Sequence, residues 1–430
     1  MKTILLFGAG KSATVLIDYL LSLSAEKGWK IMVADADKQR VEEKLGTKTP
    51  NTEAIGLDIT DTGKRGDYIS RADLVISMMP PTLHLLIAQD CLKMKKHLLT
   101  ASYADDSIKA MGKEAKENGI LMLCEMGLDP GIDHMSAMHI IHRLQQQGAT
   151  ITSFKSHCGG LVAPESDNNP WHYKISWNPR NVVTAGKSGA IYREHNQVIE
   201  IPYEKVFSNP VVVEVEGVTY SYYANRNSLS YIPLYGLEDV QTFVRTTLRY
   251  PDYMSGWNNI IKLGLTDENE KVHIKNEPLA NFLNKKIEEA GGMPDDSLFL
   301  TQMNYLGLND NSTLLPEGNY SAADVLQFAL EKKLVLNPSD KDMIVMLHEF
   351  DYVINGQQHT LQSSLVVKGK DSLRTAMAKT VGLPLGIAAK LILEGVIKIS
   401  GVHVPILPEI YNPVLNELSA NGISFNEKGN

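Results

Sequence analysis

A glycine-rich turn near the start of the chain constrains the fold more than any other sequence feature. The apolar run 4–7 favours a strand, residues Gly8–Ala13 follow it, and apolar positions at helical spacing continue to Leu23. The first glycine permits a tight turn, the second lets the backbone approach a pyrophosphate, and the small Ala13 lets helix pack on strand. The helix N-terminus offers N–H groups and a partial positive charge to phosphates. This pattern predicts dinucleotide binding, the alternative being a glycine-rich turn in a non-binding α/β protein.

Acidic residues end the next two predicted strands. Asp35 ends the strand 30–34 and lies 22 residues after Ala13, close to the spacing of about 20 at which an acid binds the ribose 2′-OH of NAD. A carboxylate there would repel the 2′-phosphate of NADP. Asp58 ends the strand 54–57 and would face the adenine. Capping of a following helix is the alternative for both residues.

Strands and helices alternate through the first 130 residues. Further strands are expected at 74–78, 97–100 and 120–124, with helical stretches between most of them. This alternation predicts a parallel sheet with helices on both faces. After residue 130 the pattern changes to strands separated by turns, at 150–157, 182–185, 190–193, 198–201, 211–215 and 242–249. Such a pattern is typical of a mixed or antiparallel sheet.

The last part of the chain adds a hairpin and several helices. Asn355 and Gly356 lie between two strand-like stretches and predict a hairpin, because both residues adopt positive φ readily. Helices are expected at 276–290, 321–333, 373–380 and 385–394. The last two are expected to be separate helices joined through Gly382 and Pro384. The stretch 256–342 is rich in helix formers, which predicts a small helical insertion.

Composition narrows the class of protein. The 430-residue chain has a formal net charge of −8, which argues against nucleic acid as the main partner. Its three cysteines are too few for a disulfide framework and suit a reducing cytoplasm, where we place the protein. No signal peptide and no window of about 18 apolar residues is expected, so we predict no membrane partner. His139 and His142 lie three apart on a predicted helix without a third ligand, so no metal site is expected.

Several longer motifs occur in order along nearly the whole chain. The most specific are Gly127–His134 and Cys158–Glu165. Shorter motifs stand at 100–103, 173–177, 225–226, 247–250, 376–379 and 381–384. In these motifs the chain resembles the glutamate-forming saccharopine dehydrogenases, also called saccharopine reductases.

The resemblance implies an α/β fold, a division into domains and a reaction. A Rossmann domain would comprise residues 1–130 and 372–430, an α+β substrate domain with a mixed sheet residues 131–255 and 343–371, and an all-helical insertion residues 256–342. The sheet domain is also expected to form a homodimer. In the implied reaction, 2-aminoadipate 6-semialdehyde and L-glutamate condense to an imine, which NAD(P)H reduces to saccharopine. The physiological direction, synthesis or breakdown of lysine, stays open.

The resemblance also implies substrate contacts. The carboxylates of saccharopine need charge-assisted donors, and arginine offers the best bidentate geometry. Arg226 and Arg249 would supply them, although each alone would be an ordinary surface arginine. Further implied substrate contacts are Ser102, Tyr103, Asp129, Thr247 and Leu248. The acid–base candidates are Asp129, Cys158 and Tyr103, whose alternatives are a turn-forming Asp-Pro-Gly, a small buried cysteine and a packed tyrosine.

Cofactor contacts follow from the turn and the resemblance together. The expected contacts are Gly8, Gly10, Lys11, Ser12, Ala13, Asp35, Asp58, Ile59, Leu128, Asp129, Gly131 and Lys174, the last with a solvated lysine as its alternative. Family members that prefer NADP carry a Cys-Arg pair after the second strand, where this chain has Asp35 and Ala36. We therefore expect a preference for NAD, with NADP as the alternative because Lys38 and Arg40 lie nearby. The family's usual tyrosine before the cysteine is His157 here.

Two other functions stay open. A related imine-reducing dehydrogenase of the polyamine or opine type would need fewer carboxylate-binding arginines, and a panel of substrates would distinguish it. A non-catalytic Rossmann protein that senses the cofactor ratio would bind cofactor without turnover. The complete set of polar family positions favours the saccharopine reaction.

Overall fold

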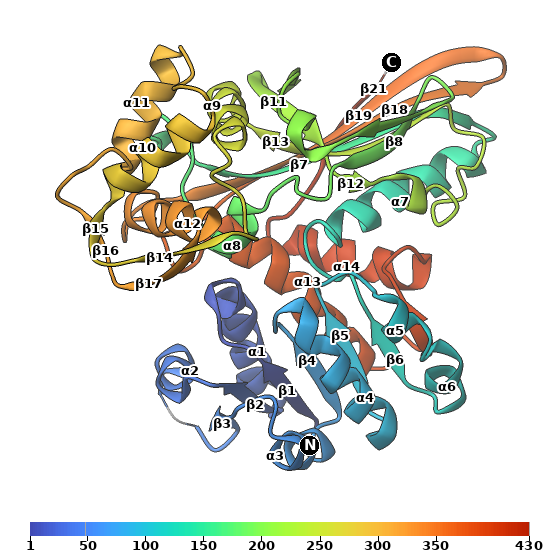
Figure 1. Ribbon diagram of the computed structural model, residues 1–430. Coiled ribbons are helices and arrows are strands. Elements are labelled where there is room, and N and C mark those ends of the chain that lie inside the picture. Colours follow the sequence, from blue (N-terminus) through green and yellow to red (C-terminus); the bar gives the residue numbers. More distant parts are fainter. Residues whose placement is uncertain (48, 430) are drawn as a thin grey trace. The chain divides into compact units, whose positions relative to one another are not determined.

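The computed structural model describes residues 1–47 and 49–429, and its contacts divide the chain into two compact units (Figure 1). The first unit holds residues 1–146 and 373–425, and the second holds residues 147–372 and the described residues from 426 onward. The contacts group the stretch 256–342 with the second sheet. The division into three domains therefore stays a prediction.

The first unit is built on a parallel sheet of seven strands in the order β20-β6-β5-β4-β1-β2-β3. These strands are β1 (Thr3–Phe7), β2 (Lys30–Asp35), β3 (Thr52–Gly56), β4 (Leu74–Ser77), β5 (His97–Thr100), β6 (Leu121–Leu123) and β20 (Gly401–His403). All of β1 is buried, because a parallel sheet is covered on both faces. The order reverses beside β1, and ligands of such sheets bind beyond the carboxyl ends of the strands at this point. The predicted Rossmann fold is confirmed, although β20 was not predicted.

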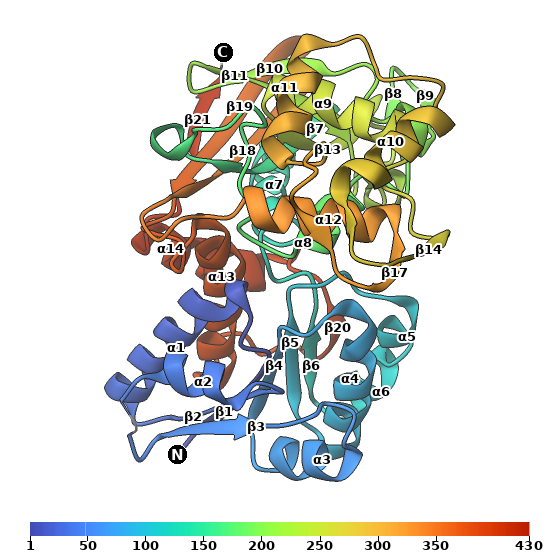
Figure 2. The same ribbon diagram turned by 60° about the vertical axis from the view of Figure 1, so that its left-hand side comes forward.

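Helices cover both faces of this sheet. The helix α1 packs with α13, and α3 packs with α4 on the other side (Figure 2). The helices of this unit are η1 (Lys11–Ala13), α1 (Thr14–Lys27), α2 (Lys38–Leu45), α3 (Thr62–Ser70), η2 (Pro81–Leu83), α4 (His84–Met94), α5 (Asp106–Lys109), α6 (Gly112–Glu117), α7 (Ile132–Gln146), α13 (Ala376–Leu393) and α14 (Pro408–Ala420).

The helix α13 corrects two predictions. It runs unbroken through Gly382 and Pro384, so the expected pair of helices is wrong. The glycines serve close packing on α1: a Cβ at Gly382 would lie 3.0 Å from the Cβ of Leu16, and one at Gly386 would lie 2.5 Å from the ring of Tyr19. Among the described residues, α13 is also long and apolar enough to cross a membrane, contrary to expectation. Because 72% of that stretch is buried inside the protein, it has the position of a core helix.

The second unit is built on a mixed sheet of ten strands. Its main path is β10-β11-β13-β7-β18-β19-β21, with β8, β9 and β12 attached beside β13. The strands are β7 (Thr150–Val162), β8 (Ala190–Glu194), β9 (Gln197–Ile201), β10 (Val211–Val215), β11 (Val218–Ala224), β12 (Arg226–Asn227), β13 (Thr242–Arg249), β18 (Asp342–Ile354), β19 (Gln357–Lys368) and β21 (Asn426–Gly429). β7 and β13 are parallel, whereas β18 pairs antiparallel with both β7 and β19. The predicted mixed sheet is confirmed.

A hairpin prediction and a strand prediction in this unit had opposite outcomes. The hairpin is confirmed, since Asn355 and Gly356 join β18 to β19 at φ values of 52° and 79°. The expected strand 182–185 is wrong, because a short helix, α8 (Pro179–Val183), covers its start. Asn178 caps this helix through a hydrogen bond from the N–H of Arg180, and Pro179 occupies its first turn. These local signals outweigh the β propensity of the valines.

The helical stretch of the second unit confirms the helices expected near 276–290 and 321–333. Ser321 and Asp324 form a capping box at the start of the second of these. The helices are α9 (Pro251–Lys262), α10 (Leu279–Glu289), α11 (Ser297–Leu306) and α12 (Ala322–Lys333), with single turns η3 (Pro164–Ser166), η4 (Tyr203–Lys205) and η5 (Leu229–Tyr231). The stretch is not entirely helical, because β14 (Lys271–Ile274) pairs with β17 (Gly318–Ser321) and β15 (Glu277–Pro278) pairs with β16 (Leu314–Leu315).

Candidate active site

The glycine-rich turn lies at the carboxyl end of β1, as predicted. Gly8 has a φ of 98°, and a Cβ there would lie 2.9 Å from the carbonyl oxygen of Met78, so only glycine fits. At Gly10, in contrast, a Cβ would meet nothing within 4 Å. The turn thus presents open backbone before η1 and α1, a surface that a pyrophosphate can approach.

Asp35 joins the end of β2 to this turn. Its carboxylate accepts hydrogen bonds from the N–H groups of Ala9, at 2.7 Å, and Asp37, at 3.0 Å. Helix α2 is capped by Asp37, so the capping alternative does not apply to Asp35. Arg40 lies 3.8 Å from the Asp35 carboxylate. A negative group therefore stands beside the turn, held by two backbone donors.

Asp58 and Ile59 follow β3. Asp58 is exposed, and hydrogen bonds from the N–H and hydroxyl of Thr60 hold the pKa of its carboxyl below its usual value. Ile59 is buried. Asp61, rather than Asp58, caps α3. Asp58 therefore stabilises a turn, and its predicted contact with the adenine stays a prediction.

Lys44 is a residue beside the turn that no sequence motif indicated. From α2 its ammonium donates to the carbonyl oxygen of Gly10, at 2.6 Å, and to the hydroxyl of Thr14, at 2.8 Å. Burial, and then repulsion by Arg40, lowers the pKa of Lys44 to about 8. Only the fold brings this lysine to the turn.

His84 connects the carboxyl ends of β4 and β5. Its Nδ1 lies 2.8 Å from the hydroxyl of Ser77, and its Nε2 lies 2.7 Å from the hydroxyl of Ser102. The hydroxyl of Thr100 also lies 3.3 Å from Nε2. Ser102 was predicted from the sequence, whereas Ser77 and His84 were not, although Ser77 stands at a strand end where ligand-binding side chains gather.

We predict that His84 makes stability depend on pH. Burial lowers the pKa of its imidazole from 6.5 to about 4, against an opposing attraction from Asp105. Between these values the unfolded chain binds the proton and the folded chain does not, so stability is full above pH 6.5 and is lost as the pH falls towards 4. The shift corresponds to roughly 3 kcal/mol.

Urea unfolding at pH 7.5 and 4.5 measures this effect. His84→Gln, which does not titrate, should lose less stability than the wild type over that interval. An identical loss in both proteins would contradict the assignment.

Glu125, two residues before the turn 127–131, is tied to the loop that carries Ser102 and Tyr103. The N–H of Glu125 donates to the carbonyl oxygen of Ser102, at 2.9 Å, and its carboxylate accepts from the N–H of Ala104, at 3.2 Å. The other oxygen of this carboxylate lies 2.8 Å from His134 Nε2. The structure therefore brings the predicted residues Ser102 and Tyr103 to the same end of the sheet as Leu128 and Asp129.

Within this turn the backbone packs on itself. The Asp129–Pro130 peptide bond is cis, and Gly131 has a φ of 148°. The N–H of Gly131 donates to the Asp133 carboxylate at 2.6 Å. Asp133 is the second residue of α7 (Ile132–Gln146), so this contact ties the turn to the start of the helix.

We predict that Gly131→Ala lowers the free energy of unfolding by at least about 2–3 kcal/mol. A Cβ there would lie 2.1 Å from the carbonyl oxygen of Gly127, in a backbone conformation that side chains rarely adopt. Gly119→Ala is the matched control, since Gly119 also has positive φ but its Cβ would meet nothing within 4 Å. That control should cost about 1–2 kcal/mol. Chemical denaturation compares them, and equal losses would refute the steric argument.

In the second unit, the register of β7 and β13 places Cys158 beside Thr247. Because side chains alternate along a strand, Cys158, Thr247 and Arg249 share one face of the sheet. Leu248 points to the opposite face, where it belongs to a buried apolar cluster. Gly159 allows the strands to approach there, since a Cβ on it would lie 2.7 Å from the Cβ of Leu248.

Arg249 is buried without a carboxylate partner among the described residues. It is 3% exposed, and its guanidinium lies 5.2 Å from the ring centre of Tyr173 and 5.4 Å from that of Tyr253. One N–H donates to the carbonyl oxygen of Leu248, whereas Nε has no hydrogen-bond partner within residues 1–47 and 49–429. Burial alone would lower the pKa of Arg249, but the oxygens of the neighbouring tyrosines raise it overall. Buried charges are normally paired, so this guanidinium is suited to an anionic ligand.

Comparison with known proteins places the chain in a family. Residues 4–123 match the saccharopine dehydrogenase NADP binding domain, and residues 127–423 match the saccharopine dehydrogenase C-terminal domain. The chain belongs to the saccharopine dehydrogenase family. The resemblance inferred from the motifs is confirmed.

Relatives of this family differ in length. The chain is 32% identical to saccharopine dehydrogenase [NADP(+), L-glutamate-forming] of Saccharomyces cerevisiae, over 99% of both proteins. It is 33% identical to the mitochondrial alpha-aminoadipic semialdehyde synthase of Bos taurus and 31% identical to the Arabidopsis thaliana synthase, and it spans only 47% and 44% of those proteins.

Solved structures agree with the family assignment. Apo saccharopine dehydrogenase (L-Glu forming) from Saccharomyces cerevisiae superposes with a TM-score of 0.89 at 29% identity, over the whole of both chains. Homospermidine synthase from Legionella pneumophila, solved with NAD, has a TM-score of 0.60 at 9% identity over 99% of this chain and 91% of that one, which shows a shared fold alone.

His157, where the resemblance led us to expect a tyrosine, lies on the opposite face of β7 from Cys158. Its ring contacts the hydroxyl of Thr246, at 2.7 Å, and the carboxylate of Glu349, at 3.0 Å. The hydrogen bond with His157 lowers the pKa of Glu349. The buried imidazole of His157 is thus hydrogen-bonded at both ring nitrogens.

The remaining predicted residues have mixed surroundings. Lys174 is buried, and its ammonium lies 2.6 Å from the carboxylate of Asp340, which supports a structural role. Its cofactor contact stays a prediction. Arg226 is exposed and has a φ of 52° on β12, which pairs with β8 in the same sheet as Arg249.

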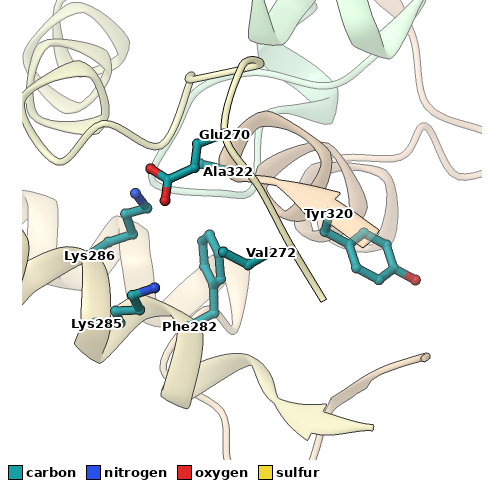
Figure 3. A pocket seen from close by; sticks show the side chains of 7 residues that line it. All are labelled: Glu270, Val272, Phe282, Lys285, Lys286, Tyr320 and Ala322. Carbon is teal, nitrogen blue, oxygen red and sulfur yellow. The ribbon is translucent and has the colours of Figure 1, made fainter. Parts of the chain in front are cut away.

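A pocket in the second unit and the surroundings of the histidines complete the description of the two units. A small pocket in the helical stretch is lined by Glu270, Val272, Phe282, Lys285, Lys286, Tyr320 and Ala322 (Figure 3). Within residues 1–47 and 49–429, no group of three His, Cys, Asp or Glu side chains is placed to hold a metal ion. His142, one of the two histidines considered for a metal, contacts the hydroxyl of Tyr411 at 2.8 Å.

Proposed function

We propose that this chain catalyses the NAD(P)-dependent interconversion of saccharopine with 2-aminoadipate 6-semialdehyde and L-glutamate. The observation that carries the proposal is Arg249, which lies on the same sheet face as Cys158 and Thr247. Its guanidinium is buried, and its Nε has no hydrogen-bond partner in the part of the chain that the structure describes. A carboxylate of saccharopine would pair with this charge. The family assignment supports the same reaction.

In this proposal, charged, neutral polar and acid–base side chains have different roles. Arg226 and Arg249 bind substrate carboxylates, while Ser102 and Tyr103 give neutral contacts at the end of β5. Asp129 holds the substrate's amino group, and Cys158 serves as a proton-transfer candidate. Hydride transfer would be supplied by the bound nicotinamide cofactor. The open backbone at Gly10 fits a dinucleotide pyrophosphate, with Lys11, Ser12 and Ala13 around it.

A spectrophotometric assay with saccharopine and each oxidised cofactor tests this function. Turnover supports it, and a panel of polyamine and opine substrates tests the related imine-reducing enzymes. Cofactor binding without turnover on any amino-acid pair would favour the sensing protein instead.

We infer a preference for NAD, although the named relatives include enzymes described by NADP(+). The Asp35 carboxylate is fixed beside the turn by the N–H groups of Ala9 and Asp37, where it would repel a 2′-phosphate. We predict that Asp35→Asn keeps an acceptor for Ala9, removes the charge and shifts the preference towards NADP about tenfold or more.

The ratio of kcat/KM for the two cofactors measures this shift. Asp37→Asn is the matched control, because it removes a nearby charge that caps α2 and pairs with Arg40. A wild-type KM that is lower for NADP than for NAD would contradict the inference.

A homodimer and a cytoplasmic location also stay proposals. β10 is an edge strand whose Val211 and Val212 are exposed, and exposed apolar edges favour pairing with another chain. Light scattering tests the dimer, and cell fractionation tests the location.

A further inference from the structure

A chain of three side chains crosses the carboxyl ends of β4 and β5. Ser77 ends β4, His84 begins α4, and Ser102 follows β5. The ring nitrogens of His84 lie 2.8 Å from the Ser77 hydroxyl and 2.7 Å from the Ser102 hydroxyl. Ser77 and His84 are buried, whereas Ser102 is half-buried at the end of the strand.

This arrangement constrains the Ser102 hydroxyl. A serine hydroxyl rotates freely unless a partner holds it. Here Nε2 of His84 is the near partner of that hydroxyl, while Thr100 accepts a hydrogen bond from the backbone N–H of Ser102, at 3.2 Å, and so holds the main chain. A neutral imidazole has one N–H and one acceptor nitrogen, so Ser77 and Ser102 must take opposite hydrogen-bonding roles.

A purely structural histidine in the same unit shows the contrast. His97 lies at the amino end of β5, and its Nδ1 accepts from the backbone N–H of Leu121 at 3.0 Å. Both ring nitrogens of His84, in contrast, contact side-chain hydroxyls at the end of the sheet where ligands of this fold bind.

We propose that His84 is a positioning residue, which holds the Ser102 hydroxyl in the orientation that contacts the substrate. This inference rests on the proposed function, in which Ser102 contacts saccharopine. His84 itself stays buried beneath Ser102 and acts through it.

A double-mutant cycle tests the proposal. Ser102→Ala and His84→Asn are each expected to raise the KM for saccharopine about tenfold with a smaller change in kcat, because one neutral hydrogen bond is lost. An asparagine at position 84 can still reach Ser77 but is too short for Ser102. The double variant should have the KM of Ser102→Ala alone, because the two changes remove the same contact.

A rescue and a control complete the design. His84→Gln, whose amide extends towards the position of Nε2, should recover most of the affinity for saccharopine. His97→Gln should lower thermal stability without changing this KM. Fluorescence titration should show unchanged cofactor affinity in all variants.

The outcomes separate this inference from the proposed function. Additive increases in KM in the double variant, or an unchanged KM in folded His84→Asn, overturn the role of His84 but leave the proposed function intact. If His84→Asn does not fold, the cycle is built with His84→Gln instead, and a rise in its KM that adds in full to that of Ser102→Ala overturns the role of His84. A wild-type protein that does not turn over saccharopine with either cofactor overturns both.

Discussion

Asp129→Asn, Cys158→Ser and Tyr103→Phe are each expected to lower kcat by about 10²–10⁴-fold without abolishing turnover. Positioned acid–base groups contribute factors of this size, and the amines of saccharopine carry protons as well. No one of the three side chains therefore supplies all of the proton transfer. Steady-state kinetics with saturating cofactor measures the loss.

A matched control for the cysteine is Cys91→Ala. Cys91 is fully buried in α4, and burial raises the pKa of its thiol, so its removal should leave kcat unchanged. If Asp129→Asn alone eliminated all turnover while cofactor binding survived, the distributed view of proton transfer would be wrong.

Arg249→Met is expected to raise the KM for saccharopine by about 30-fold to several thousand-fold. Breaking a buried charge pair costs about 2–5 kcal/mol, since the substrate carboxylate is left unpaired in a partly desolvated site. The loss should appear mainly in KM, because the contact is made in the ground state and the transition state alike. Cofactor affinity should barely change.

Arg245→Met is the matched control for this substitution. Arg245 is buried in the same strand and lies over the ring of Tyr231, at 4.4 Å, so its removal should lower stability without the rise in KM. Adding Arg226→Ala to Arg249→Met should weaken saccharopine binding further. A double variant of Arg226 and Arg249 that kept wild-type affinity would refute the arginine pocket.

The buried surroundings of Arg249 show why part of the site escaped sequence analysis. The motif indicated a carboxylate-binding arginine, which alone would be expected at the surface. The tyrosines that enclose it are Tyr173, in the segment between η3 and α8, and Tyr253, in α9. Their approach to one guanidinium depends on the packing of distant elements, for which no local pattern exists.

His84 and Lys44 make the same point for the first unit. Their partners are separated from them by 18 and 34 residues, at Ser102 and Gly10. A lone histidine or lysine in a helical stretch has no distinctive signal, because its role depends on which strand ends lie beside it in the sheet.

Local signals, by contrast, were sufficient to predict features that depend only on the backbone conformation of a few neighbouring residues. The tight turn at Gly8 and the hairpin at Asn355 and Gly356 each follow from φ preferences within a few residues. The alternation of strands and helices likewise predicted the parallel sheet of the first unit.

The sequence by itself thus determined the dinucleotide-binding turn, the two sheet types and the family, because these depend on local conformation and on motifs in order. Only the tertiary structure decided that Gly382 and Pro384 lie inside one helix, in which Gly382 and Gly386 allow close packing on α1. It also decided that Asp35 holds the turn, that His84 reaches Ser102 and that Arg249 is enclosed by tyrosines. Each of these contacts joins residues far apart in the chain. Its energy depends on burial, which a short stretch of sequence does not specify.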